Sequence, residues 1–548
     1  MKKRPNFSSL LWVWLILAAA AVQAQPAASY DLVVYGGTAA GVTTAVSAAR
    51  EGLRVVLLEP RDHLGGMVTG GLSRTDVGRR EVIGGMALEF YWRAGRHYEM
   101  HRFLQDIAWL PEPKVAEAIF QEMLKETTVE VRTRHRLREK NGVRREGRKI
   151  LDLTTENGSV FRGKVFADCS YEGDLMAQAK VSYTWGREGV ATYGEDLAGV
   201  REKTPYHQFL VDIPARDEKG NLFPEISADP PGEIGAADRK VQAYNFRLIL
   251  TDDPSNQTPF PKPADYRPER YALLARLLKA MTAKEGRALK IGDVTGPGMI
   301  PNRKGDFNNK GAFSTDYIGR NYDYPDGSYA RRAEIWRDHE NYVKGFFYFL
   351  AHDPQVPAEL QADVRRWGLA KDEFTDNGNF PNQLYIREAR RMVGDFVVTQ
   401  KDLQTELTKP DPIGMGSYNS DSHNIQRVVA PNGMVVNEGD VQVPVKPYQI
   451  PYRVMLPKKT EAANLLVPVC FSASHVAYSS LRMEPQYMIL GQAAGVAAAM
   501  AIKGKDIPVQ EVDALALTGR LKDLGAILQA DVRAQLEVIA EFSRRFKR

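Results

Sequence analysis

The stretch from 30 to 66 constrains the fold more than any other part of the chain. An apolar run at 32–35 is followed by the glycine turn GGTAAG at 36–41, a small-residue segment with helical periodicity at 42–50, and a second apolar run at 53–58 that ends at Glu59. Strand, turn, helix, strand and acid in this order are typical of a βαβ unit that binds a dinucleotide. The glycines would let the backbone approach a pyrophosphate at the helix N-terminus, and Glu59 would accept hydrogen bonds from ribose hydroxyls.

One position departs from the usual fingerprint. In G-x-G-x-x-G register the middle glycine is replaced by Thr38, with Gly37 beside it. The flanking strands, the acid and the following Gly65-Gly66 favour dinucleotide binding. The alternative, an ordinary βαβ unit with a tight turn, stays open.

Composition excludes several classes of protein. The 548 residues are 43% apolar and 26% charged, the net charge is +5 and no long Lys/Arg tract occurs, so nucleic acid is not an expected partner. Only two cysteines, Cys169 and Cys470, are present, which excludes a disulfide scaffold, although whether they pair is open. Neither a Cys/His cluster with metal-ligand spacing nor a G-x-S-x-G elbow occurs, so a metal site and a serine hydrolase are not predicted.

The N-terminus has the features of a secretory signal peptide. Lys2-Lys3-Arg4 precedes an uncharged apolar run at 10–22, and small residues follow up to Ala24. We predict a Sec-type signal at 1–24, cleaved near Ala24, and a periplasmic or secreted protein with no stable membrane insertion afterwards. An uncleaved anchor is the alternative. A second uncharged run, at 485–502, is rich in alanine and glycine and is predicted to be a buried helix.

The pattern predicts an α/β fold with one large insertion. Residues 30–190 form the first part of the nucleotide-binding domain, and 448–505 the second. Between them, 191–447 is rich in Pro, Asn, Asp and aromatic residues and has long loops, which favours an inserted α+β substrate domain. Residues 506–548 are predicted to be a charged helical tail.

Several motifs resemble one known family. GGTAAG, LGGMVTGGL, ADCSYEGD, IREARRMVGDF, DSHNIQR and the segment from NLLVPVC to GQAAGVAAAMA look like the FAD-dependent oxidoreductase family of the glutathione-reductase-like flavoproteins, here a secreted bacterial member. The resemblance runs from about 30 to 512. It implies a Rossmann-like FAD-binding domain of the glutathione-reductase type. The absence of a close cysteine pair argues against a flavin-disulfide reductase.

The resemblance also implies which residues bind FAD. The pyrophosphate and ribose would be held by the turn and the acid, the isoalloxazine would be approached through the second glycine segment, and the flavin pyrimidine would face the start of the C-terminal helix. Asp168-Cys169 stands where relatives have Asp-Ala-Thr-Gly. The predicted cofactor residues are Gly36, Gly37, Thr38, Ala39, Ala40, Gly41, Glu59, Gly65, Gly66, Met67, Asp168, Cys169, Pro485 and Gln486.

Oxidation of an alcohol or amine carbon by flavin requires a proton acceptor, and histidine has the suitable pKa. We predict His423 as the base and His475 near the flavin ring, with loop histidines that merely hydrogen-bond as the alternative. The segment 387–391 is expected at the start of a helix or a strand. In a helix, Arg387 and Arg391 are spaced to share one face and could bind a carboxylate or sugar hydroxyls, or form salt bridges instead. Arg427, Tyr452 and Arg453 are further candidates for substrate contact.

The expected function is oxidation of a small polar substrate, sugar-like or a hydroxy or carboxylate compound, by hydride transfer to FAD. Because no second strand–glycine–helix unit for a nicotinamide is visible, the expected electron acceptor is oxygen, a quinone or a periplasmic carrier. Two alternatives remain: an FAD-containing isomerase or lyase without net redox, and a ligand-binding protein with a degenerate flavin site. The sequence leaves substrate, covalent attachment of FAD and oligomeric state open.

Overall fold

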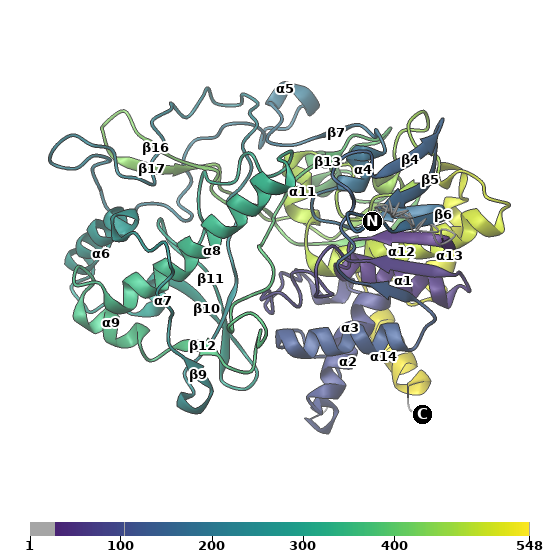
Figure 1. Ribbon diagram of the computed structural model, residues 1–548, viewed down its shortest axis with the longest axis horizontal. Helices are drawn as coiled ribbons and strands as arrows, with labels where there is room; N and C mark the ends of the chain where they lie inside the picture. Colours follow the sequence, from purple (N-terminus) through teal and green to yellow (C-terminus); the bar gives the residue numbers. More distant parts are fainter. Residues whose placement is uncertain (1–27, 104, 547–548) are drawn as a thin grey trace, which may run out of the picture.

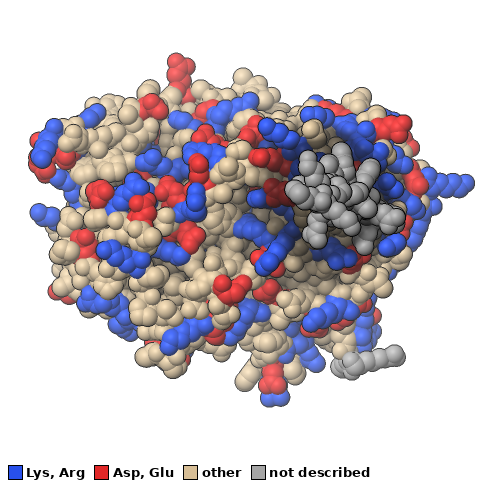
Figure 2. Space-filling view, in the orientation of Figure 1, with Lys and Arg blue, Asp and Glu red and all other residues tan. Residues whose placement is uncertain are grey.

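The computed structural model describes residues 28–103 and 105–546. The predicted signal peptide, 1–24, lies outside these residues. Figure 1 shows two lobes: a nucleotide lobe built on a seven-stranded sheet, and an inserted lobe built on a five-stranded sheet. Among the described helices, none is both long enough and apolar enough to span a bilayer. Basic and acidic side chains are interspersed over the face in Figure 2.

The sheet of the nucleotide lobe has the strand order of a dinucleotide-binding fold. β1 (Ala28–Tyr35) lies between β2 (Val55–Leu58) and β6 (Val160–Asp168), parallel to both, and β3 (Glu130–Arg132) extends the parallel edge. β5 (Lys149–Thr154) and β4 (Val143–Glu146) add an antiparallel meander beside the start of β6. β20 (Leu465–Leu466) runs parallel to the end of β6, so the chain returns to this sheet after the insertion. The predicted Rossmann-like domain is confirmed.

Two helices pack closely on one face of this sheet. α1 (Ala39–Arg50) connects β1 to β2, and α12 (Glu484–Lys503) lies against it. Close approach depends on glycine, because a Cβ on Gly491 would lie 2.4 Å from the carbonyl oxygen of Ala40 and a Cβ on Gly495 would lie 2.5 Å from that of Thr44. The buried helix predicted at 485–502 is confirmed. α2 (Gly85–His97), α3 (Pro113–Lys125) and α14 (Val532–Arg545) lie together beyond α1 (Figure 1).

The inserted lobe combines an antiparallel sheet with helices. The strand order is β10 (Thr295–Ile300), β11 (Lys304–Asn309), β8 (Leu248–Thr251), β12 (Gly368–Ala370) and β9 (Gln257–Thr258). α6 (Ala272–Glu285), α8 (Tyr329–His352) and α9 (Ala358–Val364) accompany it. The segment Gly296-Pro297-Gly298 lies within β10, an antiparallel strand, and so is not a nucleotide-binding turn.

Short paired strands lie outside the two main sheets. β7 (Tyr183–Thr184) pairs with β13 (Arg391–Met392), β14 (Pro412–Gly416) with β19 (Tyr448–Pro451), β15 (Ser420–Ser422) with β18 (Val441–Val443), and β16 (Gln426–Val429) with β17 (Val435–Glu438). α11 (His475–Leu481) packs on β15 and leads directly into α12. The tail carries α13 (Ala514–Asp523) and α14, as predicted for a helical tail.

The helical-face prediction for Arg387 and Arg391 is wrong. The chain is in neither helix nor strand from 386 to 390 and enters β13 at Arg391, so the two guanidinium groups bind different partners. The polar residues of this segment find buried carboxylates on neighbouring elements, which replaces helical pairing.

Candidate active site

The turn after β1 has the geometry of a phosphate cradle. Gly36 has φ +97°, and a Cβ on it would lie 2.6 Å from the backbone nitrogen of Ser170. A Cβ on Gly41 would lie 1.8 Å from the carbonyl oxygen of Gly36, so neither position accepts a side chain. Thr38 is the N-cap of α1: its hydroxyl accepts from the Gly41 N–H and donates to the carbonyl oxygen of Cys169 (2.8 Å). The threonine therefore ties the turn to the end of β6.

Glu59 lies at the end of β2, where the fingerprint expects the ribose ligand. Its two carboxylate oxygens accept hydrogen bonds from the N–H groups of Gly37 and Arg61, each 2.7 Å long. Burial raises the pKa of this carboxyl group, and the neighbouring Arg61 opposes the shift. Each oxygen keeps a lone pair, so the carboxylate can still accept from hydroxyl groups of a ligand.

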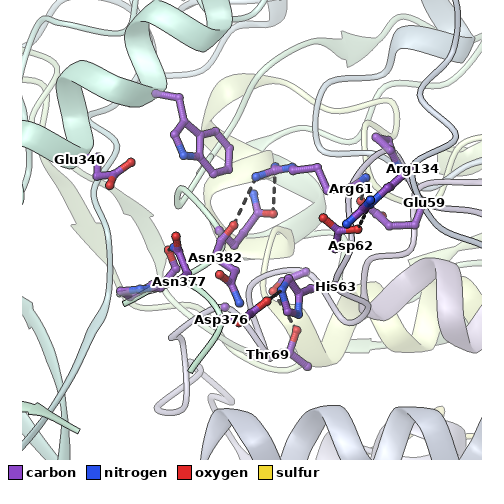
Figure 3. A pocket seen from close by; sticks show the side chains of 16 residues that line it. Glu59, Arg61, Asp62, His63, Thr69, Arg134, Glu340, Asp376, Asn377 and Asn382 are labelled. Atoms are coloured by element: carbon purple, nitrogen blue, oxygen red, sulfur yellow. Dashed lines mark hydrogen bonds and ion pairs between the residues drawn. The ribbon is translucent and has the colours of Figure 1, made fainter. Parts of the chain in front are cut away.

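Beside Glu59 lies a cavity of about 470 Å³ whose walls come from both lobes (Figure 3). Arg61 crosses it: the guanidinium lies 3.8 Å from the ring centre of Trp336 on α8 and donates to the side-chain oxygen of Gln383 (3.1 Å). His63 bonds Asp376 of the inserted lobe (2.8 Å) and Glu117 of α3 (3.4 Å). The hydrogen bond to Glu117 is the main cause that raises the pKa of His63 to about 8.

A second group of residues lies at the start of α12. The Met67 N–H donates to the Tyr171 hydroxyl, which in turn donates to Glu484 (2.7 Å). Burial raises the pKa of Glu484 to about 8, so it is largely neutral at pH 7. The second carboxyl oxygen of Glu484 and the side-chain oxygen of Gln486 are buried without a partner among the described residues. Pro485 lies in the first turn of the helix.

Asp168 and Cys169 lie next to the glycine turn at 36–41. Asp168 is fully buried and accepts hydrogen bonds from the Ser170 N–H, the Ser170 hydroxyl and the Met176 N–H. Burial raises the pKa of Asp168 to about 6. The Cys169 thiol lies 3.6 Å from the Thr44 hydroxyl inside the helix–sheet interface, and burial raises its pKa. Both Cys169 and Cys470 are free thiols.

These features fit FAD. A glycine turn without room for a side chain, a free helix N-terminus and the Glu59 carboxylate suit the adenosine and pyrophosphate groups. The unpartnered oxygens of Glu484 and Gln486, beside Met67 and Tyr171, suit the polar edge of a flavin. Gly65 and Gly66 connect the two ends, since the Gly65 N–H donates to the Gly37 carbonyl (2.7 Å) and Met67 follows.

His423 follows β15 and belongs to a buried charged cluster. Its Nδ1 lies 2.7 Å from Asp316, whose other oxygen accepts from Arg387 (2.8 Å). Its Nε2 has no hydrogen-bonding partner among the described residues. The His423 ring stacks on the ring of His207, with the ring centres 6.1 Å apart. Burial, with the charge of Arg387 next, lowers the pKa of His423. The charge of Arg387 and the hydrogen-bonded contact with His423 lower the pKa of Asp316 despite its burial.

His475 begins α11 and is held in a second cluster. Its Nδ1 lies 2.9 Å from Glu388, and its Nε2 lies 3.1 Å from the Ser422 hydroxyl. The interaction and the hydrogen bond with His475 lower the pKa of Glu388 to about 2, against the effect of burial. Gln242 joins the two clusters, because it accepts from the His423 N–H and donates to Glu388. The structure therefore brings together the predicted residues His423, His475 and Arg387.

The predicted substrate residues are placed in three different surroundings. Arg391 donates to Glu188 (2.6 Å) and lies 3.8 Å from Glu388, at the edge of the His475 cluster. Arg427 is buried in the inserted lobe, where its guanidinium donates to three uncharged oxygens. Tyr452 donates to the carbonyl oxygen of Val509, and Arg453 pairs with Asp411 (2.9 Å), both on the nucleotide lobe. Their substrate role stays a prediction.

One cluster of three carboxylates in the described part of the chain has the spacing of a metal site. Glu112, Asp372 and Glu373 bring ligand oxygens within 4.8 Å of one another. The ammonium group of the fully buried Lys304 lies 2.6 to 2.7 Å from all three. A tethered cation thus occupies the place that an ion would take.

Sequence reasoning missed several site residues. Ser422 and Glu388 adjoin the predicted His423 and Arg387, so their motifs were the available signal. Tyr171 and Glu484 adjoin predicted cofactor residues in the same way. Asp316 and Gln242 lie in irregular parts of the insertion, and nothing in their local sequence distinguishes them.

Comparison with protein families gives one match over most of the chain. The model of the family described as FAD dependent oxidoreductase matches residues 31–522. A search of curated proteins finds no match.

Solved structures match over smaller parts. OxyS anhydrotetracycline hydroxylase from Streptomyces rimosus is 14% identical over 34% of this chain and 43% of that chain, with a TM-score of 0.24. p-Nitrophenol 4-monooxygenase PnpA from Pseudomonas putida DLL-E4 is 15% identical over 29% of this chain and 45% of that chain, with a TM-score of 0.20. T. acidophilum thioredoxin reductase is 18% identical over 26% of this chain and 34% of that chain, with a TM-score of 0.16. The chain thus spans less than half the length of each of these structures.

Proposed function

Because the chain belongs to the FAD dependent oxidoreductase family, whose cofactor is FAD, we propose that it is an exported enzyme that oxidises a small polar substrate with His423 as the base. FAD, when bound, supplies the hydride acceptor. Electrons then pass to oxygen, a quinone or a periplasmic carrier. The observation that carries the proposal is the free Nε2 of His423, whose Nδ1 is anchored on Asp316.

The anchoring sets the chemistry of the ring. A carboxylate on Nδ1 keeps a proton on that nitrogen, so Nε2 presents a lone pair that can accept a substrate proton. Arg387 holds Asp316 in its ionised form, and its charge also opposes protonation of His423. Asp316 then stabilises the imidazolium that forms when His423 takes the proton.

In this proposal His475 helps to position His423 and does not itself take the substrate proton. Its two ring nitrogens are both engaged, Nδ1 by Glu388 and Nε2 by the Ser422 hydroxyl. Ser422 directly precedes His423, so the second cluster fixes the backbone from which the base projects. The Gln242 side chain couples the positions of the two histidines through its amide group.

The test replaces His423 by asparagine, with His352→Asn as the control, because His352 is exposed at the end of α8. Flavin content is read from the absorption spectrum, and anaerobic bleaching is followed with sugars, alcohols and 2-hydroxy acids. We expect both variants to hold flavin and H423N to be reduced at least about 100-fold more slowly. Bleaching of H423N at the rate of the control would refute the assignment.

The pH dependence has a fixed sign. The pKa of His423 in the folded protein lies below its ordinary value, so the base is neutral at and above pH 7. The rate of flavin reduction should therefore be flat above neutral pH and should fall in acid, below about pH 6.5. A rate that rises as pH falls would contradict a neutral histidine base.

Export and the electron acceptor are tested separately. The charged start and the apolar run at 2–22 support export. We expect the protein in the periplasm or the medium, with the mass of a chain that begins near residue 25. Substrate-reduced protein should be reoxidised by oxygen, a quinone or a carrier fraction. Rapid turnover driven by NADPH would contradict the proposed direction of electron flow.

A further inference from the structure

Arg482 is a buried arginine without an acidic partner. It lies between α11 and α12, and 3% of its surface is exposed. Its Nη1 donates to the Tyr385 hydroxyl (3.0 Å), its Nη2 donates to the Asp421 carbonyl (2.8 Å), and its Nε is buried with no partner. Within 4.0 Å of the guanidinium, no carboxylate of the described residues lies. A buried charge without a counter-charge is costly, so such a residue needs a reason beyond folding.

Arg427 also lacks a carboxylate, but all three of its guanidinium nitrogens donate to uncharged oxygens, and three other buried arginines are paired with carboxylates. Arg387 pairs with Asp316, Arg391 with Glu188, and Arg247 with Asp306 through two hydrogen bonds of 2.8 Å. Tyr385, Asp421 and Tyr487 raise the pKa of Arg482 despite its burial, and Asp76 also interacts with it, so what Arg482 lacks is a carboxylate in direct contact. The Asp421 carboxylate accepts from Tyr418 (3.3 Å), and burial raises the pKa of Asp76, which weakens it as a counter-ion.

Unused donors gather around Tyr385. Its ring lies 4.6 Å from the Arg387 guanidinium carbon and 5.9 Å from that of Arg482. The Nε–H groups of both arginines are buried and unpartnered, and the Tyr385 hydroxyl proton has no acceptor among the described residues. Two guanidinium N–H groups and one phenol are the donor set that a carboxylate accepts from.

The location connects this donor set to the proposed chemistry. Tyr385, Arg387 and Glu388 lie on one short irregular segment, and Gln383, two residues before Tyr385, lines the cavity of Figure 3. Arg482 also lies two residues before Glu484, which begins α12. The donors are therefore placed between the histidine clusters and the end of the cofactor site near Tyr171.

We propose that Arg482, with Tyr385 and Arg387, binds the carboxylate of the substrate, which makes the substrate a hydroxy or amino acid rather than a neutral sugar. The inference rests on the proposed function. The bound anion supplies the counter-charge that Arg482 lacks. Arg482 thereby determines specificity, and the carbon next to the carboxylate is presented to His423.

The test measures binding without turnover. Thermal unfolding of the FAD-loaded and the FAD-free protein is recorded with glycolate, lactate or glycine, and with 1,2-propanediol in sodium chloride of equal ionic strength. We expect the carboxylates to raise the melting temperature and the diol to leave it unchanged. Titration should also perturb the flavin spectrum. A protein that responds to none of the carboxylates overturns the proposal.

Arg482→Met and Arg387→Met form the matched pair. R482M removes an unpaired charge, so its melting temperature without ligand should equal or exceed that of the wild type. R387M strands Asp316 and should melt lower. R482M should lose the carboxylate response by at least about tenfold in Kd, and R482K should recover part of it. An R482M protein that melts as low as R387M, or fails to fold, identifies Arg482 as structural and overturns the proposal.

The outcomes separate the two proposals. If carboxylates bind through Arg482 and none bleaches the flavin, the anion site stands and the proposed oxidation fails. If neutral alcohols bleach the flavin through His423 and carboxylates bind no better, the oxidation stands and the anion site fails. If R482M shifts only the reduction potential of the flavin, Arg482 serves the cofactor, and the assignment to substrate is refuted.

Discussion

At the scale of single residues, the site relies on groups whose ionisation differs from the ordinary one. Glu484 is buried beside Tyr171, and burial raises its pKa from 4.5 to about 8. In the folded protein this carboxyl group binds a proton that the unfolded chain releases above about pH 4.5. Its contribution to stability is therefore complete in acid and is lost as pH rises through about 8.

Glu484→Gln keeps the shape and the acceptor for Tyr171 but cannot ionise. We expect the variant to match the wild type near about pH 4 and to be more stable near about pH 9, because the wild type must bury a charge there. Urea unfolding of FAD-free protein across this range measures the difference. Parallel stability profiles of the two proteins would show that Glu484 is not protonated in the folded state.

At the scale of elements, the pair α1 and α12 positions the phosphate cradle. A Cβ on Gly491 would lie 2.2 Å from the Thr43 hydroxyl and 2.4 Å from the Ala40 carbonyl oxygen, in the first two turns of α1. Any side chain at 491 must push α1 away, and with it the helix N-terminus beside the Gly36 turn.

Gly491→Ala is expected to destabilise the protein by about 1–3 kcal/mol through overpacking and to weaken FAD binding. Gly519→Ala is the control, since Gly519 is exposed in α13 with nothing within 4 Å of an added Cβ. That change should be neutral or stabilising by up to about 1 kcal/mol. Equal flavin content and equal melting temperatures in the two variants would contradict the role given to the helix pair.

At the scale of the whole molecule, buried charges fix the inserted lobe on the nucleotide lobe. Lys304 of β11 pairs with Glu112, which precedes α3, and with Asp372 and Glu373 of its own lobe. Asp174 of the nucleotide lobe pairs in the same way with Arg332 on α8. These contacts cross the boundary between the two lobes, whose residues together line the cavity in Figure 3.

Lys304→Met strands three carboxylates, two of them buried, and is expected to cost about 3–5 kcal/mol. The control is Lys114→Met, because Lys114 contacts the same Asp372 from an exposed position and its loss should cost less than about 1 kcal/mol. Chemical unfolding measures both. If K304M and K114M unfold at the same denaturant concentration, the buried cluster does not hold the two lobes together.

The local pattern determined much of the fold. The cradle, Glu59 and the close packing of 485–502 follow from glycine spacing and apolar periodicity, which act over a few residues to one βαβ unit. Figure 1 shows the corresponding lobes, and the family match is consistent with them. The arginines at 387 and 391 were misplaced because a helical spacing pattern does not reveal partners that come from distant segments.

What the sequence by itself determined is the nucleotide-binding architecture and the residue types of the cofactor site, since these depend on short-range steric and hydrogen-bonding rules. Only the tertiary structure decided which charges meet. Asp316 reaches His423 across 107 positions, Glu388 reaches His475 across 87, and Arg482 is left without a carboxylate. Long-range packing brings those side chains together or keeps them apart, and the cost of burying a charge then decides which of them are free to act on a ligand.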